Sequence, residues 1–222
     1  MTEFHVIEAA ARARLGGDDA LEDRLISPEP PESLAMIGDD RYLSVMCRRI
    51  FRAGLTHKLV DRRWPAFEIA FDDFDLEAVG ALSDDDLRRL ATDEQLIRHR
   101  KKIFAVRDNA RAMRQIVDEY GRFGVWLADW PEDEIVELWL ELRRRFTQLG
   151  GQSAPSFLRM CGKDTFMLTS WVVRAMAHWG AHDGPTHRLH DLRAIQHRFN
   201  SWEAESERDY CQISQILALS ID

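Results

Sequence analysis

The sequence predicts an all-α protein, folded as a compact, two-lobed helical domain. Apolar residues recur at helical spacing along nearly the whole chain, and no segment shows sustained alternation of β-branched and polar residues. Glycine pairs and a proline-rich stretch separate the helical segments. We therefore expect residues 1–38 to form acidic helices and a proline-rich linker packed on the core, and residues 39–222 to form the main helical domain.

The first helices follow from spacing and breakers. Phe4, Ile7 and Ala11 predict a helix that ends at Gly16-Gly17, and Asp18 or Asp19 is expected to cap a short helix through Leu25. Prolines within residues 27–32 exclude a continuous helix there, so this stretch is interpreted as a linker.

A core helix follows, capped by Asp39 or Asp40. Its apolar face is formed by four side chains that recur every three to four residues, with Gly54 at its end: Leu43, Met46, Cys47 and Ile50. Further helix starts are expected at Ser83 and around Pro131, where acidic residues suit the positive end of the helix dipole.

Composition limits the class of protein. The 222 residues are 45% hydrophobic and 31% charged, and no apolar run approaches the roughly 20 residues of a membrane-spanning helix. The first 15 residues lack the order of a secretory signal, so we expect a cytoplasmic monomer without membrane association. The three isolated cysteines are interpreted as buried thiols: Cys47, Cys161 and Cys211.

The net charge of −8 argues at first against a nucleic-acid partner. Residues 1–40, however, hold ten acidic and three basic side chains, which accounts for −7 of that charge. Two basic clusters remain in the rest of the chain. The first lies between residues 98 and 114 with Asp108 as its one acid, and the second is Arg143-Arg144-Arg145. A DNA partner is therefore compatible with the charge distribution.

Residues 146–157 have the pattern of a helix, a tight hairpin and a second helix. A helix from Ile135 to Phe146 leads into two glycines, and a new helix is expected near Ser153 with Pro155 in its first turn. Glycines allow close approach of a partner, and free amides at the second helix can bind a phosphate, although an ordinary helix connection has the same pattern. The expected DNA contacts are Gly150, Gly151, Gln152, Ser153, Lys163, Arg98, Arg100, Lys101 and Lys102.

Several motifs between Asp40 and Arg111 resemble the bacterial DNA-3-methyladenine glycosylase I family. They are Ala53-Gly-Leu-Thr56, Phe71-Asp-Asp-Phe-Asp75, Asp84-Asp-Asp-Leu87, Leu96-Ile-Arg-His-Arg-Lys-Lys-Ile103 and Asn109-Ala-Arg111, with a weaker likeness from Thr169 to Gly180. The resemblance implies a helix-hairpin-helix DNA glycosylase. Such an enzyme flips a damaged base out of double-stranded DNA and hydrolyses its N-glycosidic bond without a cofactor.

The chain departs from the family at the zinc site. The Cys-Gly-Trp start, the Tyr-His pair and the C-terminal His and Cys of the family are missing here. We therefore expect no structural zinc, because such a site needs four ligands in closed geometry. His182, His187 and His190 are interpreted as surface residues.

The resemblance also implies an altered base pocket. Arg49 and His57 stand where the family has a glutamate and a tryptophan, and Thr169 stands where many related enzymes have an aspartate. Arg49 would repel a cationic base and suit an acceptor-rich one. Alternatively, Arg49 turns outward and pairs with an acid. We expect catalytic roles for Arg49, His57, Thr169 and Ser170, and a base pocket that includes Arg52, Thr56 and Trp171.

Three functions remain open from the sequence. The first is a DNA glycosylase of base-excision repair. The second is a relative that binds lesions or bent duplex DNA but has lost excision. The third is a helical interaction protein whose acidic first 40 residues bind a partner. Salt-dependent duplex binding separates the first two from the third.

Overall fold

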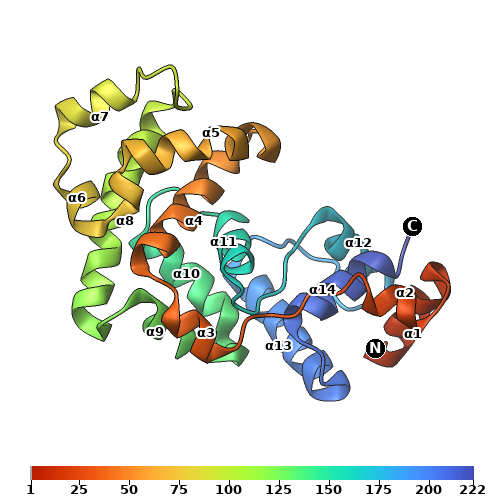
Figure 1. The fold of residues 1–222 in the computed structure, drawn as a ribbon. Coiled ribbons are helices and arrows are strands. Elements are labelled where there is room, and N and C mark those ends of the chain that lie inside the picture. Colours follow the sequence, from red (N-terminus) through yellow and green to blue (C-terminus); the bar gives the residue numbers. More distant parts are fainter. Residues whose placement is uncertain (1) are drawn as a thin grey trace. The chain divides into compact units, whose positions relative to one another are not determined.

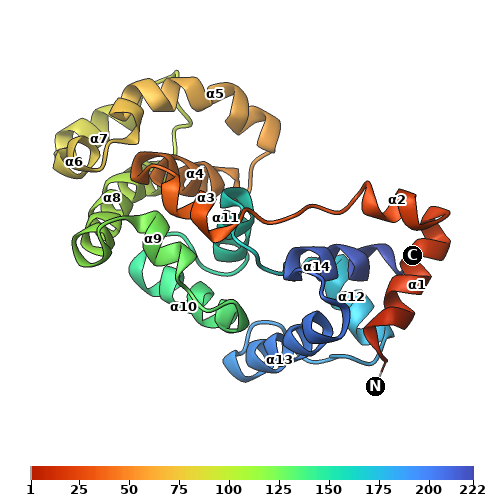
Figure 2. The same cartoon turned by 60° about the horizontal axis from the view of Figure 1, so that its bottom comes forward.

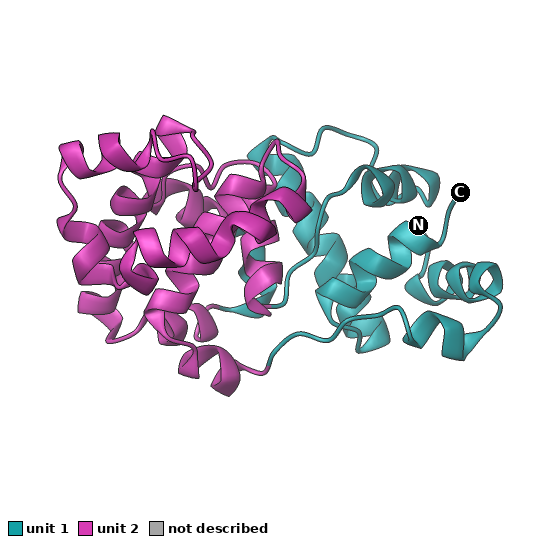
Figure 3. Cartoon of the chain, turned by 45° about the horizontal axis from the view of Figure 1, so that its top comes forward, with its two compact units in different colours: residues 1–29, 131–138, 164–222 teal, residues 30–130, 139–163 magenta. Residues whose placement is uncertain are grey.

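The computed structural model describes residues 2–222, and every regular element within that range is a helix (Figure 1). This confirms the all-α prediction. None of the helices in residues 2–222 has the length and apolar character needed to cross a bilayer. The chain forms two compact units (Figure 3): unit 1 comprises the chain up to Glu29, Pro131–Leu138 and Asp164–Asp222, and unit 2 comprises Pro30–Trp130 and Trp139–Lys163.

The two units divide the helices between them. Unit 1 holds α1 (Phe4–Leu15), α2 (Asp18–Glu22), η2 (Glu132–Glu134), α12 (Ser170–His178), α13 (Leu189–Ser206) and α14 (Tyr210–Leu219). Unit 2 holds α3 (Pro31–Met36), α4 (Asp39–Arg52), α5 (His57–Ala70), η1 (Asp72–Phe74), α6 (Leu76–Ala81), α7 (Asp84–Leu90), α8 (Arg100–Tyr120), α9 (Phe123–Ala128) and α11 (Ser153–Cys161). The boundary falls within α10 (Ile135–Arg145).

Unit 2 is built around α4 and α8. The predicted apolar face of α4 is buried, and this helix packs on α5, α8, α9 and α11. Figures 1 and 2 show α6 and α9 alongside α8. Aromatic side chains of α5 and η1 pack against one another. Trp64 stacks on Phe67 and Phe74, with ring centroids 4.9 and 5.5 Å apart. The family-like motif at residues 71–75 thus supplies core side chains, Phe71 and Phe74.

Unit 1 joins the two ends of the chain. Its core contains Phe166 stacked on Phe199 at 4.1 Å, with Trp202 and Phe4 beside them. Helix α1 packs on α13 and α14, so residues at the start and end of the sequence share one apolar core.

The helix starts follow the predictions in part. Ser83 forms the expected cap, in a capping box with Asp86. The prediction that Asp39 or Asp40 caps α4 is wrong: Gly38 holds that position, because the Asp39 carboxylate instead accepts from the Phe123 amide at 2.9 Å. Gly17 likewise replaces Asp18 or Asp19 as the cap of α2, which ends at Glu22, short of Leu25.

The proline-rich stretch is not entirely a linker. Helix α3 begins at Pro31, whose fixed φ and missing N–H suit the first position of a helix. Only residues 23–30 remain non-helical there.

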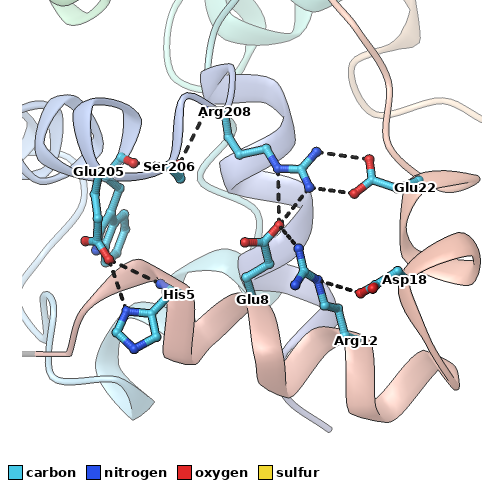
Figure 4. Close-up of polar contacts among 9 residues, drawn as sticks. His5, Glu8, Arg12, Asp18, Glu22, Glu205, Ser206 and Arg208 are labelled. Atoms are coloured by element: carbon cyan, nitrogen blue, oxygen red, sulfur yellow. Dashed lines mark hydrogen bonds and ion pairs between the residues drawn. The ribbon is translucent and has the colours of Figure 1, made fainter.

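One arginine connects the N-terminal helices to the turn between α13 and α14 (Figure 4). Arg208 donates to Glu8 at 2.8 Å and to Glu22 at 2.5 and 3.0 Å. Arg12 extends the network to Glu8 and Asp18, each at 3.0 Å. The hydrogen bond with Glu22 is the main cause that raises the pKa of Arg208, and burial opposes it. Three acids of the N-terminal segment are therefore neutralised within unit 1.

Gly124 permits the closest approach of α9 to α3. A Cβ at this position would lie 2.5 Å from the Leu34 carbonyl oxygen and 3.1 Å from the Tyr42 ring. We predict that Gly124→Ala lowers the free energy of unfolding by about 1–3 kcal/mol, because backbone rather than a flexible side chain must move. Gly80→Ala is the matched control: its Cβ would meet only the Arg111 side chain, at 3.6 Å, and chemical denaturation should show unchanged or slightly increased stability. Equal stability of the two variants would contradict the tight contact.

We also predict that Arg208→Met lowers stability at neutral pH by about 1–3 kcal/mol, because the partly buried Glu8 carboxylate then keeps only Arg12 as a partner and Glu22 loses its hydrogen bonds. The hydrogen bond from Arg208 lowers the pKa of Glu22, so its stabilising effect is present above the ordinary glutamate pKa and is lost as the pH falls through the folded-state value. Denaturation between acidic and neutral pH should therefore show a shallower acid dependence in Arg208→Met. Arg24→Met, which alters an exposed arginine of the same unit, should keep the dependence of the parent.

Candidate functional site

The last two turns of α4 carry three arginines with different surroundings. Arg48 and Arg52 share one carboxylate of α5, Asp61, at 2.9 and 2.6 Å. The Arg52 guanidinium also lies 3.7 Å from the sulfur of Met160 in α11. One acid therefore balances two cations at this helix end. The sequence pattern did not indicate either Asp61 or Met160 as a partner of these arginines.

Arg49 has no such partner. Its side chain is half-buried, and the buried Nε lacks a hydrogen-bond acceptor. No carboxylate in residues 2–222 forms an ion pair with it, so the alternative of an outward-turned, acid-paired Arg49 does not describe this structure. Burial lowers the pKa of Arg49, and the positive charge of Arg52 lowers it further.

Lys102 approaches the same helix end from α8. Only 7% of the residue is exposed, and its Nζ donates to the carbonyls of Ala53 at 2.6 Å and Phe51 at 3.4 Å. These carbonyls belong to the negative end of the α4 dipole, which a cation stabilises. Burial lowers the pKa of Lys102, and the nearby charge of Arg49 adds to that effect.

The turn between α4 and α5 carries Thr56 and His57, both exposed. Thr56 holds the N-cap position of α5, but its side chain makes no capping hydrogen bond, and the first turn of α5 contains no acid. Gly54, at φ 79°, allows the chain to reverse here. The turn is thus open and electropositive.

The hairpin between α10 and α11 is anchored to α8. The buried Asn109 amide donates to the Thr147 carbonyl at 3.1 Å and accepts from the Thr147 amide at 2.7 Å. Gly150, Gly151 and Gln152 are exposed, and Gly151 needs its positive φ of 58°. Asn109 belongs to a motif that sequence reasoning used only for the resemblance.

Of the amides expected to be free at the start of α11, that of Ser153 already has a partner. This amide donates to the Gly150 carbonyl at 3.1 Å, and Ser153 is only 8% exposed. Pro155 has no N–H, so the first turn of α11 offers fewer donors than the pattern suggested. The exposed part of the hairpin is residues 150–152.

Lys163 lies inside unit 2. The residue is 3% exposed, and its Nζ donates to the carbonyls of Trp130 at 3.1 Å and Ala128 at 3.4 Å, at the end of α9. A contact between Lys163 and a DNA phosphate would require these hydrogen bonds to break. Arg98, Arg100 and Lys101, by contrast, are exposed at the start of α8.

The basic clusters are partly neutralised in three dimensions. Arg144 and Arg145 both bind Glu141, and the hydrogen bond from Arg144 is the main cause that lowers the pKa of Glu141 to about 2. In the first cluster, Arg107 pairs with Asp84, and Arg114 pairs with Asp118. Arg98 also pairs with Glu94, at 3.8 Å. Among residues 2–222, Arg100 and Lys101 of the first cluster and Arg143 of the second are exposed and form no ion pair.

The start of α12 belongs to unit 1. Thr169 caps this helix, since its Oγ1 accepts from the Val172 amide at 3.2 Å. Thr169, Ser170 and Trp171 are exposed, and the Arg174 guanidinium lies 4.6 Å from the centre of the Trp171 ring. Thr169 thus has a structural role as a helix cap, whatever its part in chemistry.

Two hollows of unit 1 have no counterpart in the sequence analysis. The first, of about 560 Å³, is lined by Arg14, Arg174, His178 and the C-terminal residues Ser220–Asp222. The second, of about 350 Å³, is acidic and includes Asp164 and Asp209. No group of three or more His, Cys, Asp or Glu residues within 2–222 is arranged to hold a metal ion.

Comparison with known proteins links the chain to one family. A family model described as methyladenine glycosylase matches residues 34–149. DNA-3-methyladenine glycosylase 1 of Escherichia coli (strain K12) is 34% identical over 76 residues, which cover 34% of this chain. The chain spans only 41% of the length of that relative.

Solved structures show the same fold. A variant of 3-methyladenine DNA glycosylase I in complex with 3-methyladenine superposes with a TM-score of 0.54 at 23% identity, covering 64% of this chain and 84% of that one. A variant of the enzyme from Staphylococcus aureus gives a TM-score of 0.53 at 22% identity, covering 68% and 91%.

Proposed function

The chain belongs to the methyladenine glycosylase family, and from this premise we propose that it is a DNA glycosylase of base-excision repair. It would bind double-stranded DNA and release an alkylated or otherwise damaged base. The observation that carries the proposal is the family match over residues 34–149, which includes α4, the turn to α5 and the start of α8. We further propose that it acts as a cytoplasmic monomer.

The proposed base pocket lies at the end of α4. Arg49, with its unpaired guanidinium, and His57, at the exposed start of α5, would face the flipped base, with Arg52 and Thr56 beside them. For unit 1, separately, we propose that Thr169, Ser170 and Trp171 at the start of α12 contact DNA. Their exposure and the arginine over the Trp171 ring support a contact with a base or sugar.

The reaction would transfer the deoxyribose C1′ from the base nitrogen to water. The bond between C1′ and the base nitrogen breaks and its electron pair leaves with the base. The oxygen of the attacking water bonds to C1′, and the proton that this water loses passes to bulk solvent. A cationic base would leave with little acid or base assistance, whereas the neutral or acidic base that Arg49 favours needs a proton as it leaves. Position 169 holds a threonine, which offers no carboxylate for either role.

The proposed DNA surface combines the exposed hairpin with the start of α8. Gly150–Gln152 would allow close approach of the backbone, and Arg98, Arg100 and Lys101 would contact phosphates. Lys102, Ser153 and Lys163 are buried. In this proposal they support the site through hydrogen bonds to backbone carbonyls.

One observation favours a second candidate, a relative that binds lesions without excising them. The Thr169 hydroxyl accepts from the Val172 amide and so is committed to the cap of α12. No carboxylate within residues 168–172 is available to activate water. Release of a base from DNA separates this candidate from the first.

The deciding experiment is incubation of the purified protein with methylated DNA, followed by chromatography of the released bases. We predict weak 3-methyladenine release, because Arg49 would repel that cationic base. At a separation of about 4 Å, the repulsion is about 1 kcal/mol in water and about 4 kcal/mol at an effective dielectric of 20. Arg49→Glu should raise 3-methyladenine release several-fold. Arg62→Glu, the same charge change at an exposed position of α5, should leave it unchanged.

Two outcomes would count against this pocket. Efficient 3-methyladenine release that Arg49→Glu leaves unaltered would mean that Arg49 does not face the base. Absence of any released base, with intact duplex binding, would favour the second candidate.

The hairpin is tested by a charge placed at Gly150, where a Cβ would meet open space. We predict that Gly150→Glu weakens duplex binding about tenfold by repelling phosphates, while Gly150→Ala binds like the parent. Both variants should keep the helical circular dichroism. Equal binding by all three proteins in a fluorescence titration would remove the hairpin from the DNA surface.

A further inference from the structure

The end of α4 holds more positive charge than the carboxylates among residues 2–222 balance. Arg48, Arg49 and Arg52 lie in its last two turns, and the Lys102 amine binds the carbonyls just beyond them. Asp61 is the acid that pairs with this group, and it serves Arg48 and Arg52 alone. We name Arg49, Arg52 and Lys102 the α4 cation cluster.

The cluster is partly buried, which makes its excess charge unfavourable. The Nε of Arg49 is buried without an acceptor, and Lys102 is 93% buried. Two carbonyls accept from the Lys102 amine, which leaves one of its three donors without an acceptor among residues 2–222. Burial of an unpaired charge costs free energy unless an opposite charge compensates it.

Three other partly buried arginines have carboxylate partners: Arg208 has Glu8 and Glu22, Arg107 has Asp84, and Arg145 has Glu141. Three more have other partners, since Arg63 and Arg122 donate to backbone carbonyls and Arg198 lies over the Trp202 ring. Arg49 has none of these kinds of partner among residues 2–222, and it lies where the open, acid-free turn to α5 begins.

We infer that the α4 cation cluster is a binding site for a negatively charged oxygen group of a ligand, held by the Arg49 guanidinium. The planar fork of an arginine matches two adjacent oxygens, and the charges of Arg52 and Lys102 strengthen the attraction. Binding would supply the compensation that no carboxylate among residues 2–222 gives to Arg49. The pKa values of Arg49 and Lys102, both lowered by burial and then by a neighbouring cation, would rise towards their ordinary values on binding.

The origin of the oxygen group rests on the proposed function. In DNA, one source is a phosphodiester beside the extruded nucleotide. The other is the extruded base itself, if it is acidic and presents carbonyl oxygens. Both offer the same chemistry to Arg49, and the cluster disfavours a cationic base in either case.

The site itself is tested without DNA. The melting temperature is measured with increasing inorganic phosphate against chloride at constant ionic strength, for the parent, Arg49→Met and the control Arg62→Met. Phosphate should stabilise the parent and Arg62→Met, and affinity from a calorimetric titration should fall tenfold or more in Arg49→Met. In chloride, Arg49→Met should be at least as stable as the parent, because an uncompensated charge has been removed.

Two results would overturn the inference. One is an unchanged phosphate response in Arg49→Met. The other is a clear loss of stability of Arg49→Met in chloride, which would make Arg49 a structural residue. Neither result depends on excision, so a protein that binds phosphate through Arg49 but releases no base would contradict the proposed function and leave the site in place.

The source is then identified with two duplexes. One carries a tetrahydrofuran abasic analogue, and the other carries xanthine, an acidic purine with two carbonyl oxygens. A phosphodiester ligand predicts that Arg49→Met weakens binding of both duplexes about equally. A base ligand predicts a tenfold or larger loss for the xanthine duplex alone. Unchanged binding of both would overturn DNA as the source of the ligand.

Discussion

The arrangement of unit 2 depends on the amine of Lys102 at the end of α4. A helix that ends inside a protein leaves carbonyls that need donors, and Lys102 supplies them from α8. The bond fixes where α4 stops, and with it the direction in which the turn leads into α5. Arg49, Thr56 and His57 take their positions from that constraint. Burial of the lysine also concentrates positive charge beside Arg49.

Ion pairs within each unit, rather than the net charge of the whole chain, decide where charge stays unbalanced. In unit 1, acids of the first helices are paired with arginines, as the bonds from Arg208 to Glu8 and Glu22 show. In unit 2, basic residues that look free in the sequence, such as Arg107 and Arg144, also find partners. Arg100, Lys101 and Arg143, which are exposed, and the half-buried Arg49 are among the basic residues of unit 2 that form no ion pair within residues 2–222. A net charge of −8 therefore says little about DNA binding by this chain.

The fold was predictable because local signals and burial agree. The spacing of Leu43, Met46, Cys47 and Ile50 marks the buried face of α4, and Ser83 caps α7 as its side chain suggests. Errors arose where a side chain serves a distant backbone group. Asp39 binds the Phe123 amide instead of capping its own helix, and the partnership of Asp61 with two arginines required knowledge of how α5 lies against α4. The presence of an arginine at position 49 was visible in the sequence, but its lack of an ion-pair partner was not.

The division of the chain has a consequence for synthesis on the ribosome. Every segment of unit 2 has been made once residue 163 has emerged, so this unit can acquire its core early. Unit 1 needs α1 to meet α13 and α14, which are translated after all of unit 2. Until then Glu8 and Glu22 lack Arg208, and the first 29 residues lack the helices on which they pack. Their high charge keeps such a waiting segment hydrated and resists premature association.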